Sequence, residues 1–339
     1  MSTIKYIIVS ATGDYTTKII ADWIKYYGGN VRIVNTDLEK VDIRSIKLNN
    51  NKNETVLSLS NEVILSNEVK KVVFFRRGLI RLLNSTNSFH SPSSFFDTES
   101  NVKYFFTTYE MSKRELVDNF FSENIKYGKD NGSRTNKIIN LKAAQINGLN
   151  IPDTLVTISK KELIDWAKSK GKIITKALDT GMFFGNKTTK KMYHQLTKSV
   201  SLNDIATFKN TFPLTLFQEK IEKILELRVF YLNKVCWSSA IISQSQENTL
   251  DDCRNYDPEQ MNRVVPYKLP KNLQAKIIKF MVYIGMETGS LDIILSKDNK
   301  YYFLEVNPGG QFSSISNKCN FYLEKEIAKN MIYYGEKYN

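Results

Sequence analysis

Two apolar segments near the C-terminus, separated by a short turn, most constrain how this chain can fold. Residues 290–295 read SLDIIL and residues 301–310 read YYFLEVNPGG. A link of five residues between two strand-like runs predicts an antiparallel hairpin. Each run carries one carboxylate, Asp292 or Glu305, among residues that are normally buried. The fold must therefore compensate acidic side chains in apolar surroundings, because burying an unpaired charge is costly.

The same hairpin predicts a metal site. Side chains two positions apart in a strand share a face, so Glu305 and Asn307 point to the same side. In an antiparallel hairpin Asp292 can face them from the neighbouring strand. Three oxygen donors on one face favour Mg²⁺, which binds a few carboxylates together with phosphate oxygens. The alternative is an edge strand whose carboxylates face water, which the apolar neighbours disfavour.

The N-terminal part of the chain predicts an α/β domain. Residues 5–11 read as a buried strand, residues 14–27 have apolar side chains at helical spacing, and residues 31–34 predict a second strand. Alternating runs between residues 43 and 65 predict a β-meander, and a helix is expected over residues 102–124. A strand, helix and second strand in this order are typical of α/β folds.

A polar, glycine-containing segment at residues 128–133 predicts a domain boundary. Strands and helices are expected to follow it. The expected helices are 136–147, 160–170, 273–288 and 323–334, and the expected strands are 172–177, 214–221, 226–231, 235–242, 291–295 and 301–306.

Composition narrows the classes of function. The net charge of +13 favours anionic partners, although a solvated basic surface is an equally weighted alternative. No basic run with interleaved aromatic residues predicts nucleic-acid binding. Two histidines disfavour a histidine-centred site, and three isolated cysteines favour a reducing cytoplasm. We expect neither a signal peptide nor a membrane helix.

The motifs together resemble the ATP-grasp superfamily. The pattern SLDII…YYFLEVNPGGQF resembles its metal-binding end. Asn136-Lys137 with NGLNIPDT resembles the start of the ATP-grasp fold, and Lys176 ends a strand as the nucleotide-binding lysine does. Residues 217–221 resemble the hinge that holds adenine, and residues 226–229 resemble the E-x-R strand beyond it.

This resemblance implies an α/β (α+β) ATP-grasp fold with an N-terminal α/β pre-ATP-grasp domain. It implies a division into three parts: the pre-ATP-grasp domain over 1–128, a central subdomain over 129–213, and a C-terminal subdomain over 214–339 that holds the hinge and the metal site.

A finer resemblance is to the grasp-with-spasm peptide maturases, relatives of the microviridin ligases that make graspetides. It rests on FFRRG at 74–78, DYTTKIIADWI at 14–24, DDCRNYD at 251–257 and EVNPGGQF at 305–312. Such enzymes activate a carboxylate as an acyl phosphate and join it to a nucleophile. The resemblance implies ATP and Mg²⁺, with two ions expected, and a homodimer is compatible with it.

The implied substrate is an acidic ribosomal precursor peptide, with a leader and a core, whose Asp or Glu side chains are joined to Ser or Thr hydroxyls as esters. No nucleic-acid or membrane partner is expected. Two other functions stay open. One is a RimK-like amino-acid ligase or a small-molecule carboxylate–amine ligase, and the other is a nucleotide-binding regulator without turnover. The complete Asp, Glu and Asn metal set disfavours the regulator.

The resemblance also implies roles for particular residues at the nucleotide. Lysines would contact the phosphates, and Glu219 would accept a hydrogen bond from the adenine amine while the backbone of Lys220 and Ile221 meets the ring edge. Solvated lysines and an exposed strand-end carboxylate are the alternatives. The expected nucleotide-binding residues are Lys137, Lys176, Gln218, Glu219, Lys220 and Ile221.

Three arginines are candidates for a clamp on the acyl phosphate: Arg228, Arg254 and Arg77. Guanidinium groups suit bidentate recognition of oxyanions. For Arg228 a structural pair with Glu226 is the competing interpretation, and Arg254 lies in a polar loop where solvation is the competing one. Strand alternation would direct only one of Arg76 and Arg77 towards a cleft, and we expect Arg77.

Overall fold

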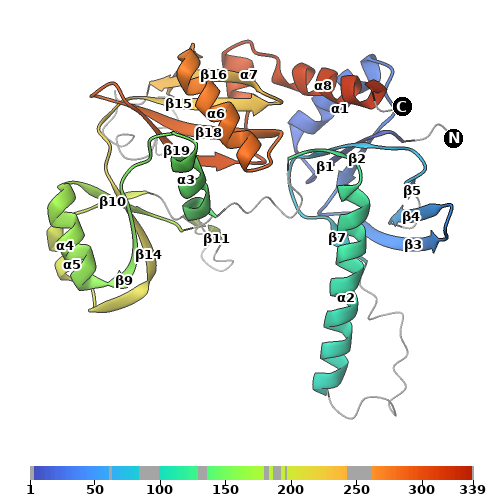
Figure 1. Ribbon diagram of the computed structural model, residues 1–339, viewed down its shortest axis with the longest axis horizontal. Helices are drawn as coiled ribbons and strands as arrows, with labels where there is room; N and C mark the ends of the chain where they lie inside the picture. Colours follow the sequence, from blue (N-terminus) through green and yellow to red (C-terminus); the bar gives the residue numbers. More distant parts are fainter. Residues whose placement is uncertain are drawn as a thin grey trace. The chain divides into compact units, whose positions relative to one another are not determined.

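The structure is a computed structural model that falls into two compact units (Figure 1). The first unit is Met1–Ser133 with Tyr322–Asn339, and the second is Arg134–Phe321. Each unit is described by itself. The structure describes residues 4–60, 63–83, 99–128, 136–178, 183–185, 192–194, 197–242 and 262–337.

A parallel sheet forms the centre of the first unit. Its strands, in spatial order, are β2 (Val31–Asn35), β1 (Tyr6–Ser10), β6 (Val72–Phe75) and β8 (Ile125–Tyr127). The helix α1 (Tyr15–Tyr26) begins after Asp14, whose carboxylate accepts a hydrogen bond from the backbone N–H of Thr16. The helix α8 (Leu323–Lys337) lies beside α1 (Figure 1). The strand–helix–strand predicted over residues 5–34 is confirmed.

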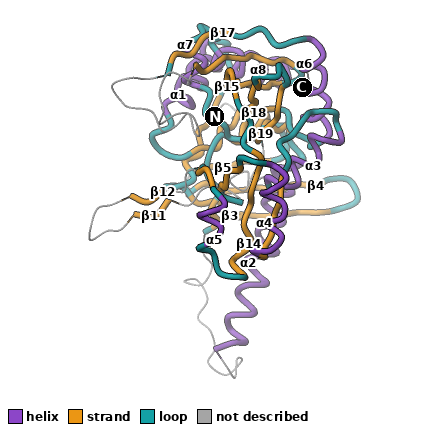
Figure 2. The backbone as a smooth tube through the Cα atoms, turned by 90° about the vertical axis from the view of Figure 1, so that its left-hand side faces the viewer, coloured by secondary structure: helices purple, strands orange, loops and turns teal. Residues whose placement is uncertain are grey.

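The predicted meander is also present in the first unit. It consists of the antiparallel strands β3 (Lys40–Leu48), β4 (Asn53–Leu59) and β5 (Val63–Ser66), with β7 (Arg81–Leu82) parallel to β3. The C-terminal part of α2 (Glu99–Ser122) buries Val117, Phe120 and Phe121 against both sheets of this unit. The opposite end of α2 extends away from these sheets in both views (Figures 1 and 2).

A four-stranded antiparallel sheet begins the second unit. In spatial order its strands are β13 (Lys198–Val200), β10 (Ile173–Lys176), β14 (Thr211–Glu219) and β9 (Thr154–Ser159). The helices α4 (Lys160–Lys170) and α5 (Leu202–Ala206) pack against it through Leu163, Ala167 and Ile205. A separate two-stranded ribbon pairs β11 (Phe183–Gly185) with β12 (Met192–His194).

A five-stranded antiparallel sheet completes the second unit. In spatial order its strands are β17 (Arg263–Pro266), β16 (Val235–Ile242), β15 (Lys223–Leu232), β18 (Thr288–Ser296) and β19 (Tyr301–Asn307). The helices α3 (Lys137–Ile146) and α6 (Lys271–Tyr283) share one core with it, which includes Leu227, Val229 and Tyr231 of β15. The intervening residues of β15 therefore face the other side. The short helix α7 (Ser313–Lys318) follows β19.

The boundaries differ from the predicted ones at several places. The helix expected over 273–288 ends at Tyr283, because Gly285 adopts a φ of 63° that ends a helix and the chain then enters β18. The strand β14 begins at Thr211 and pairs with β9 and β10, and residues 322–339 group with the first unit. Neither grouping was part of the three-part division expected from the sequence.

Several short elements were not expected at all, because two to six residues are too few to show a period. They are β7, β8, β11, β12, β13, β17, α5 and α7. Within the described residues, no helix combines the length and the apolar character needed to cross a membrane.

A buried lysine of the first unit gives a prediction for stability against pH. Lys71 is 1% exposed and donates hydrogen bonds to the carbonyl oxygens of Ser66 and Val69. Burial lowers the pKa of Lys71 to about 8 from 10.5. The unfolded chain therefore binds more protons between these values, so stability rises with pH in this window. Relative to Lys71→Met, we expect the unfolding free energy of the wild type to rise by about 2 kcal/mol from about pH 7.5 to 9.5.

Urea unfolding of both proteins at matched pH values measures this difference. The hydrogen bonds lost in the variant lower its unfolding free energy by the same amount at every pH. The comparison therefore uses the slope of the unfolding free energy against pH. Parallel pH profiles for the two proteins would contradict the assignment.

Candidate functional site

The strands β18 and β19 form an antiparallel hairpin, as the sequence predicts. Asp292 lies opposite Glu305, and Ser290 lies opposite Asn307. Asn307 Nδ2 donates a hydrogen bond of 3.4 Å to Glu305 Oε1, so these two side chains share one face. The predicted antiparallel pairing is confirmed, whereas the role of these three side chains as metal ligands stays a prediction.

One feature of the hairpin was not predicted. The pairing shifts between Asp292 and Ile293, which leaves Leu304 as an extra residue in β19. Phe303 and Val306 pack into the core of the sheet, while Leu304 lines a pocket. The bulge therefore lets β19 supply both a wall of the pocket and the carboxylate opposite Asp292.

Arg228 extends this arrangement across a third strand. It lies opposite Asp292 on β15, so Arg228, Asp292 and Glu305 form one row over three neighbouring strands. Arg228 Nη1 lies 2.6 Å from Asp292 Oδ1, an ion pair in which Nη1 makes no aligned hydrogen bond within the described residues. The competing pair with Glu226 is not formed, because Glu226 pairs with Lys223.

Lys137 approaches the same face from α3. The side chain of Asn136 caps this helix by accepting from the backbone N–H groups of Ile138 and Ile139. Lys137 therefore occupies the first helical position. Its Nζ lies 3.4 Å from Glu305 Oε2 and donates a hydrogen bond of 3.2 Å to the carbonyl of Ala177, just after β10.

The surroundings of Glu305 keep it ionised. Burial raises the pKa of this carboxyl, but the nearby charges of Lys137 and Lys176 and hydrogen bonds from Asn307 and Lys137 lower it by more. The net effect is a pKa below the ordinary value of a glutamate. Glu305 is therefore an anion at neutral pH.

The donor set suits Mg²⁺ better than a metal held by protein alone. Two carboxylates and one amide oxygen, from Asp292, Glu305 and Asn307, face the same side of the hairpin. In the part of the chain that the structure describes, no group of three His, Cys, Asp or Glu side chains could hold a metal. Mg²⁺ is usually bound by one or two carboxylates plus phosphate oxygens, so these residues fit it.

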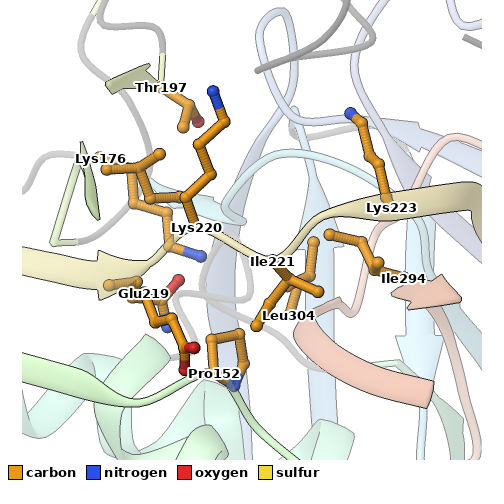
Figure 3. Close-up of a pocket in the computed structure, with 11 residues that line it drawn as sticks. Pro152, Lys176, Thr197, Glu219, Lys220, Ile221, Lys223, Ile294 and Leu304 are labelled. Carbon is orange, nitrogen blue, oxygen red and sulfur yellow. The ribbon is translucent and has the colours of Figure 1, made fainter. Parts of the chain in front are cut away.

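A pocket lies beside this face, within the second unit (Figure 3). Figure 3 shows Lys220 and Lys223 extending to the opposite side of the chain from Glu219 and Ile221. Five of the six expected nucleotide-binding residues line the pocket, and Lys137 is the exception. The lining residues are Pro152, Ile174, Lys176, Thr197, Gln218, Glu219, Lys220, Ile221, Lys223, Ile294 and Leu304.

Gln218 has a hydrogen-bonding group to offer in this pocket. Its side chain is buried, and Nε2 donates a hydrogen bond of 2.9 Å to Thr154 Oγ1. Its Oε1 is buried and has no hydrogen-bond partner among the described residues. An unsatisfied buried carbonyl oxygen costs free energy, so the arrangement favours a ligand that donates a hydrogen bond here.

The hinge after β14 limits which backbone groups can meet the adenine ring. The backbone N–H of Lys220 donates to the carbonyl of Lys172 at 2.9 Å, and the Lys220 ammonium donates to Ser199 Oγ at 3.0 Å. A ring edge that needs a backbone donor would therefore have to meet Ile221. Other pocket residues escaped the sequence reasoning, although Ile174 shares a face with Lys176 by strand alternation.

Arg254 and Arg77 are the other two candidate arginines. Arg254 is outside the described residues. Arg76 and Arg77 belong to the first unit, and the Nε of each lies 3.5 Å from Asp14 Oδ2. Arg76 is 2% exposed, whereas the side chain of Arg77 is 41% exposed. Strand alternation does not separate them, because β6 ends at Phe75 before either arginine. The catalytic roles of Arg77 and Arg254 stay predictions.

Comparisons with solved structures identify the fold of this chain. No family model matches the chain, and no curated protein matches it. A RiPP-associated ATP-grasp ligase from Chryseobacterium gregarium, solved with ADP and a leader and core peptide, has a TM-score of 0.74 at 23% identity, over 97% of this chain and 96% of that one.

Two further structures agree. Macrocyclase MdnC from Microcystis aeruginosa MRC, bound with precursor peptide MdnA, has a TM-score of 0.72 at 22% identity, over 97% of this chain and 99% of that one. The ATP-grasp ligase PsnB, complexed with a minimal precursor, Mg and ADP, has a TM-score of 0.70 at 14% identity, over 99% of both chains. The predicted mixed α/β class and ATP-grasp fold are thereby confirmed along nearly the whole chain.

The turn after β19 gives a prediction about how the site is held. A Cβ at Gly310 would lie 2.4 Å from Ser290 Cβ and 2.9 Å from the carbonyl oxygen of Asn307. Gly310→Ala must therefore displace the turn that carries Asn307, and overpacking of this kind costs about 1–3 kcal/mol. Gly289→Ala is the matched control in the same hairpin, because the Cβ there meets only side-chain methyl groups, the nearest at 3.0 Å on Met286.

Urea unfolding followed by circular dichroism compares the two variants. Gly289→Ala should cost less than Gly310→Ala. Equal stability of Gly310→Ala and the wild type would show that the turn is not held by this contact.

Proposed function

We propose that this chain is an ATP-dependent ligase that modifies a ribosomal precursor peptide. It activates Asp or Glu side chains as acyl phosphates and joins them to Ser or Thr hydroxyls, which closes ω-ester rings. The observation that carries the proposal is the adjacency, in one compact unit, of the Lys176–Gln218–Glu219 pocket and the Asp292–Glu305–Asn307 face. The fold is similar to RiPP-associated ATP-grasp ligases over nearly the whole chain.

The pocket would bind the nucleotide. Gln218 Oε1 and the Glu219 carboxylate can accept hydrogen bonds from the adenine amine, and the buried Gln218 is held in place by Thr154. Lys176, which lines the same pocket, and Lys137 would contact the phosphates. We place the reaction in the cytoplasm, where ATP is available.

Asp292, Glu305 and Asn307 would hold Mg²⁺, with two ions proposed, and the metal would supply neutralisation of phosphate charge. In the first step a carboxylate oxygen of the peptide attacks the γ-phosphorus of ATP, and ADP leaves. In the second step a hydroxyl oxygen attacks the acyl carbon. Inorganic phosphate leaves and the hydroxyl proton is released, so the peptide loses one water in total.

Among the described arginines of the second unit, Arg228 is the candidate for acting on this chemistry. In the ligand-free structure it pairs with Asp292 on the same face as Glu305. Its guanidinium can instead give bidentate hydrogen bonds to an oxyanion. Arg228 would therefore orient and stabilise the acyl phosphate.

An acidic peptide suits the chain as a substrate. The net charge of +13 favours an anionic partner, and it is the main support for a peptide rich in Asp and Glu over a free amino acid. A homodimer belongs to the same proposal, and light scattering of the purified protein checks it.

The metal-site assignment predicts loss of turnover in two variants. Asp292→Asn and Glu305→Gln each remove one charge from the face proposed to bind Mg²⁺. We expect ADP release in the presence of peptide to fall by about 10²-fold or more, because charge stabilisation at phosphates is lost. Asp298→Asn is the matched control, since Asp298 is half-exposed in the turn of the same hairpin and pairs with Lys300.

Thermal melts of all three variants separate lost chemistry from lost folding. Turnover close to the wild-type rate in both Asp292→Asn and Glu305→Gln would refute the assignment.

The substrate proposal predicts the mass and lability of the product. Each ring closure should lower the mass of the peptide by one water, and mild alkali should restore it, because esters hydrolyse in base and amides do not. Peptide binding should weaken as salt rises, since charges are screened over about 8 Å at physiological ionic strength. Mass spectrometry before and after alkali is the measurement.

A product that gains the mass of an amino acid would replace this proposal with the RimK-like alternative. If no peptide changed the rate of ATP hydrolysis, both ligase proposals would be contradicted.

A further inference from the structure

Each predicted metal carboxylate is already paired with a cation of the chain. Arg228 Nη1 lies 2.6 Å from Asp292 Oδ1, and Lys137 Nζ lies 3.4 Å from Glu305 Oε2. Lys176 adds a third positive charge that acts on Glu305. Among the described residues, two negative charges therefore face three positive ones before any ligand arrives.

We propose that Lys137 and Arg228 make metal binding conditional on the nucleotide. They act as internal cations that neutralise Glu305 and Asp292 and keep a free divalent cation out of the nucleotide-free protein. Phosphates then draw the two basic side chains away from the carboxylates, which completes the metal site. This inference rests on the proposed function, because it takes the site to be one for nucleotide and metal.

Electrostatics supports exclusion of the free cation. A divalent ion between Asp292 and Glu305 would lie within a few ångströms of Lys137 and Arg228, and like charges at that distance repel strongly when partly shielded from water. Mg²⁺ also gives up its hydration shell reluctantly. With their charges already compensated, the two carboxylates offer little to overcome that cost.

The number of donors supports the same conclusion. Within the described residues the face offers two carboxylates and the amide oxygen of Asn307, and no third acidic, histidine or cysteine ligand joins them. Mg²⁺ prefers six oxygen ligands in octahedral geometry. Phosphate oxygens can therefore supply donors that the described residues do not.

The ion pairs are also of a kind that an anion can replace. All four side chains are partly exposed, between 17% and 28%. A phosphate can therefore reach both basic side chains and compete with the carboxylates for them. Lys137 keeps its hydrogen bond to the carbonyl of Ala177 as a second anchor beside the end of β10, so it can turn from Glu305 towards a phosphate without leaving the site.

Mn²⁺, a paramagnetic substitute for Mg²⁺, tests the proposal. Its binding to the nucleotide-free protein is followed by electron paramagnetic resonance, and ADP affinity is measured by calorimetry with and without Mn²⁺. We expect a dissociation constant of about 1 mM or weaker for Mn²⁺ alone, and an ADP affinity about tenfold higher with Mn²⁺ present.

The variant Lys137→Met separates this role from a structural one. Removing the cation beside Glu305 should raise Mn²⁺ affinity of the nucleotide-free protein about tenfold, while ADP affinity without metal falls. Effects of opposite sign on the two ligands do not follow from damaged folding. Lys142→Met, an exposed lysine on the same helix, is the matched control and should change neither affinity.

Arg228→Gln is the second variant, in case Lys137→Met is unstable, and it should also raise Mn²⁺ affinity. Arg263→Gln, at an exposed position of β17, is its control. Tight Mn²⁺ binding by the nucleotide-free wild type, or unchanged Mn²⁺ affinity in both variants, overturns the inference alone. Failure of the wild type to bind ADP at all overturns the proposed function and the inference together.

Discussion

The compensation of two carboxylates on an apolar hairpin is the constraint on which the second unit depends. The side chains of Asp292 and Glu305 are only 28% and 24% exposed, so desolvation disfavours leaving either charge without a cation close by. Arg228 supplies one from β15, and Lys137 supplies the other from α3. These two ion pairs thus join three strands and a helix at the candidate site. The same contacts stabilise the fold and place the charges of the site.

Local patterns were enough to predict much of this arrangement. Strand alternation and a five-residue turn predicted an antiparallel hairpin with Asp292 facing Glu305 and Asn307, and the structure has this hairpin, although the bulge sets its register. The helix predicted over 160–170 has these bounds in the structure, where Ser159 caps its start and Gly171, at a φ of 76°, ends it. Such features depend only on neighbours in sequence, which is why sequence reasoning reaches them.

The cross-strand partner of Arg228 and the bulge in β19 could not be predicted from local patterns. Proximity in sequence suggested Glu226 as the partner of Arg228, but β18 lies beside β15 and brings Asp292 closer. The bulge at Leu304 arises because Phe303 and Val306 both enter the core, which leaves two residues between inward side chains where regular alternation leaves one. Strand order and core packing decide both, and neither has a local signature.

The charges of the candidate site also help to distinguish an enzyme from a protein that only binds a nucleotide. A regulator that only held a nucleotide would need the pocket and its lysines, but it would gain nothing from Asp292 and Glu305. Ionised carboxylates beside phosphates repel them unless a cation lies between, so keeping both lowers affinity for a bare nucleotide. Transfer of a phosphoryl group requires charged groups of this kind. They oppose binding of the bare nucleotide but fit a metal–phosphate complex. The cost of these two side chains is therefore itself an argument for an enzyme.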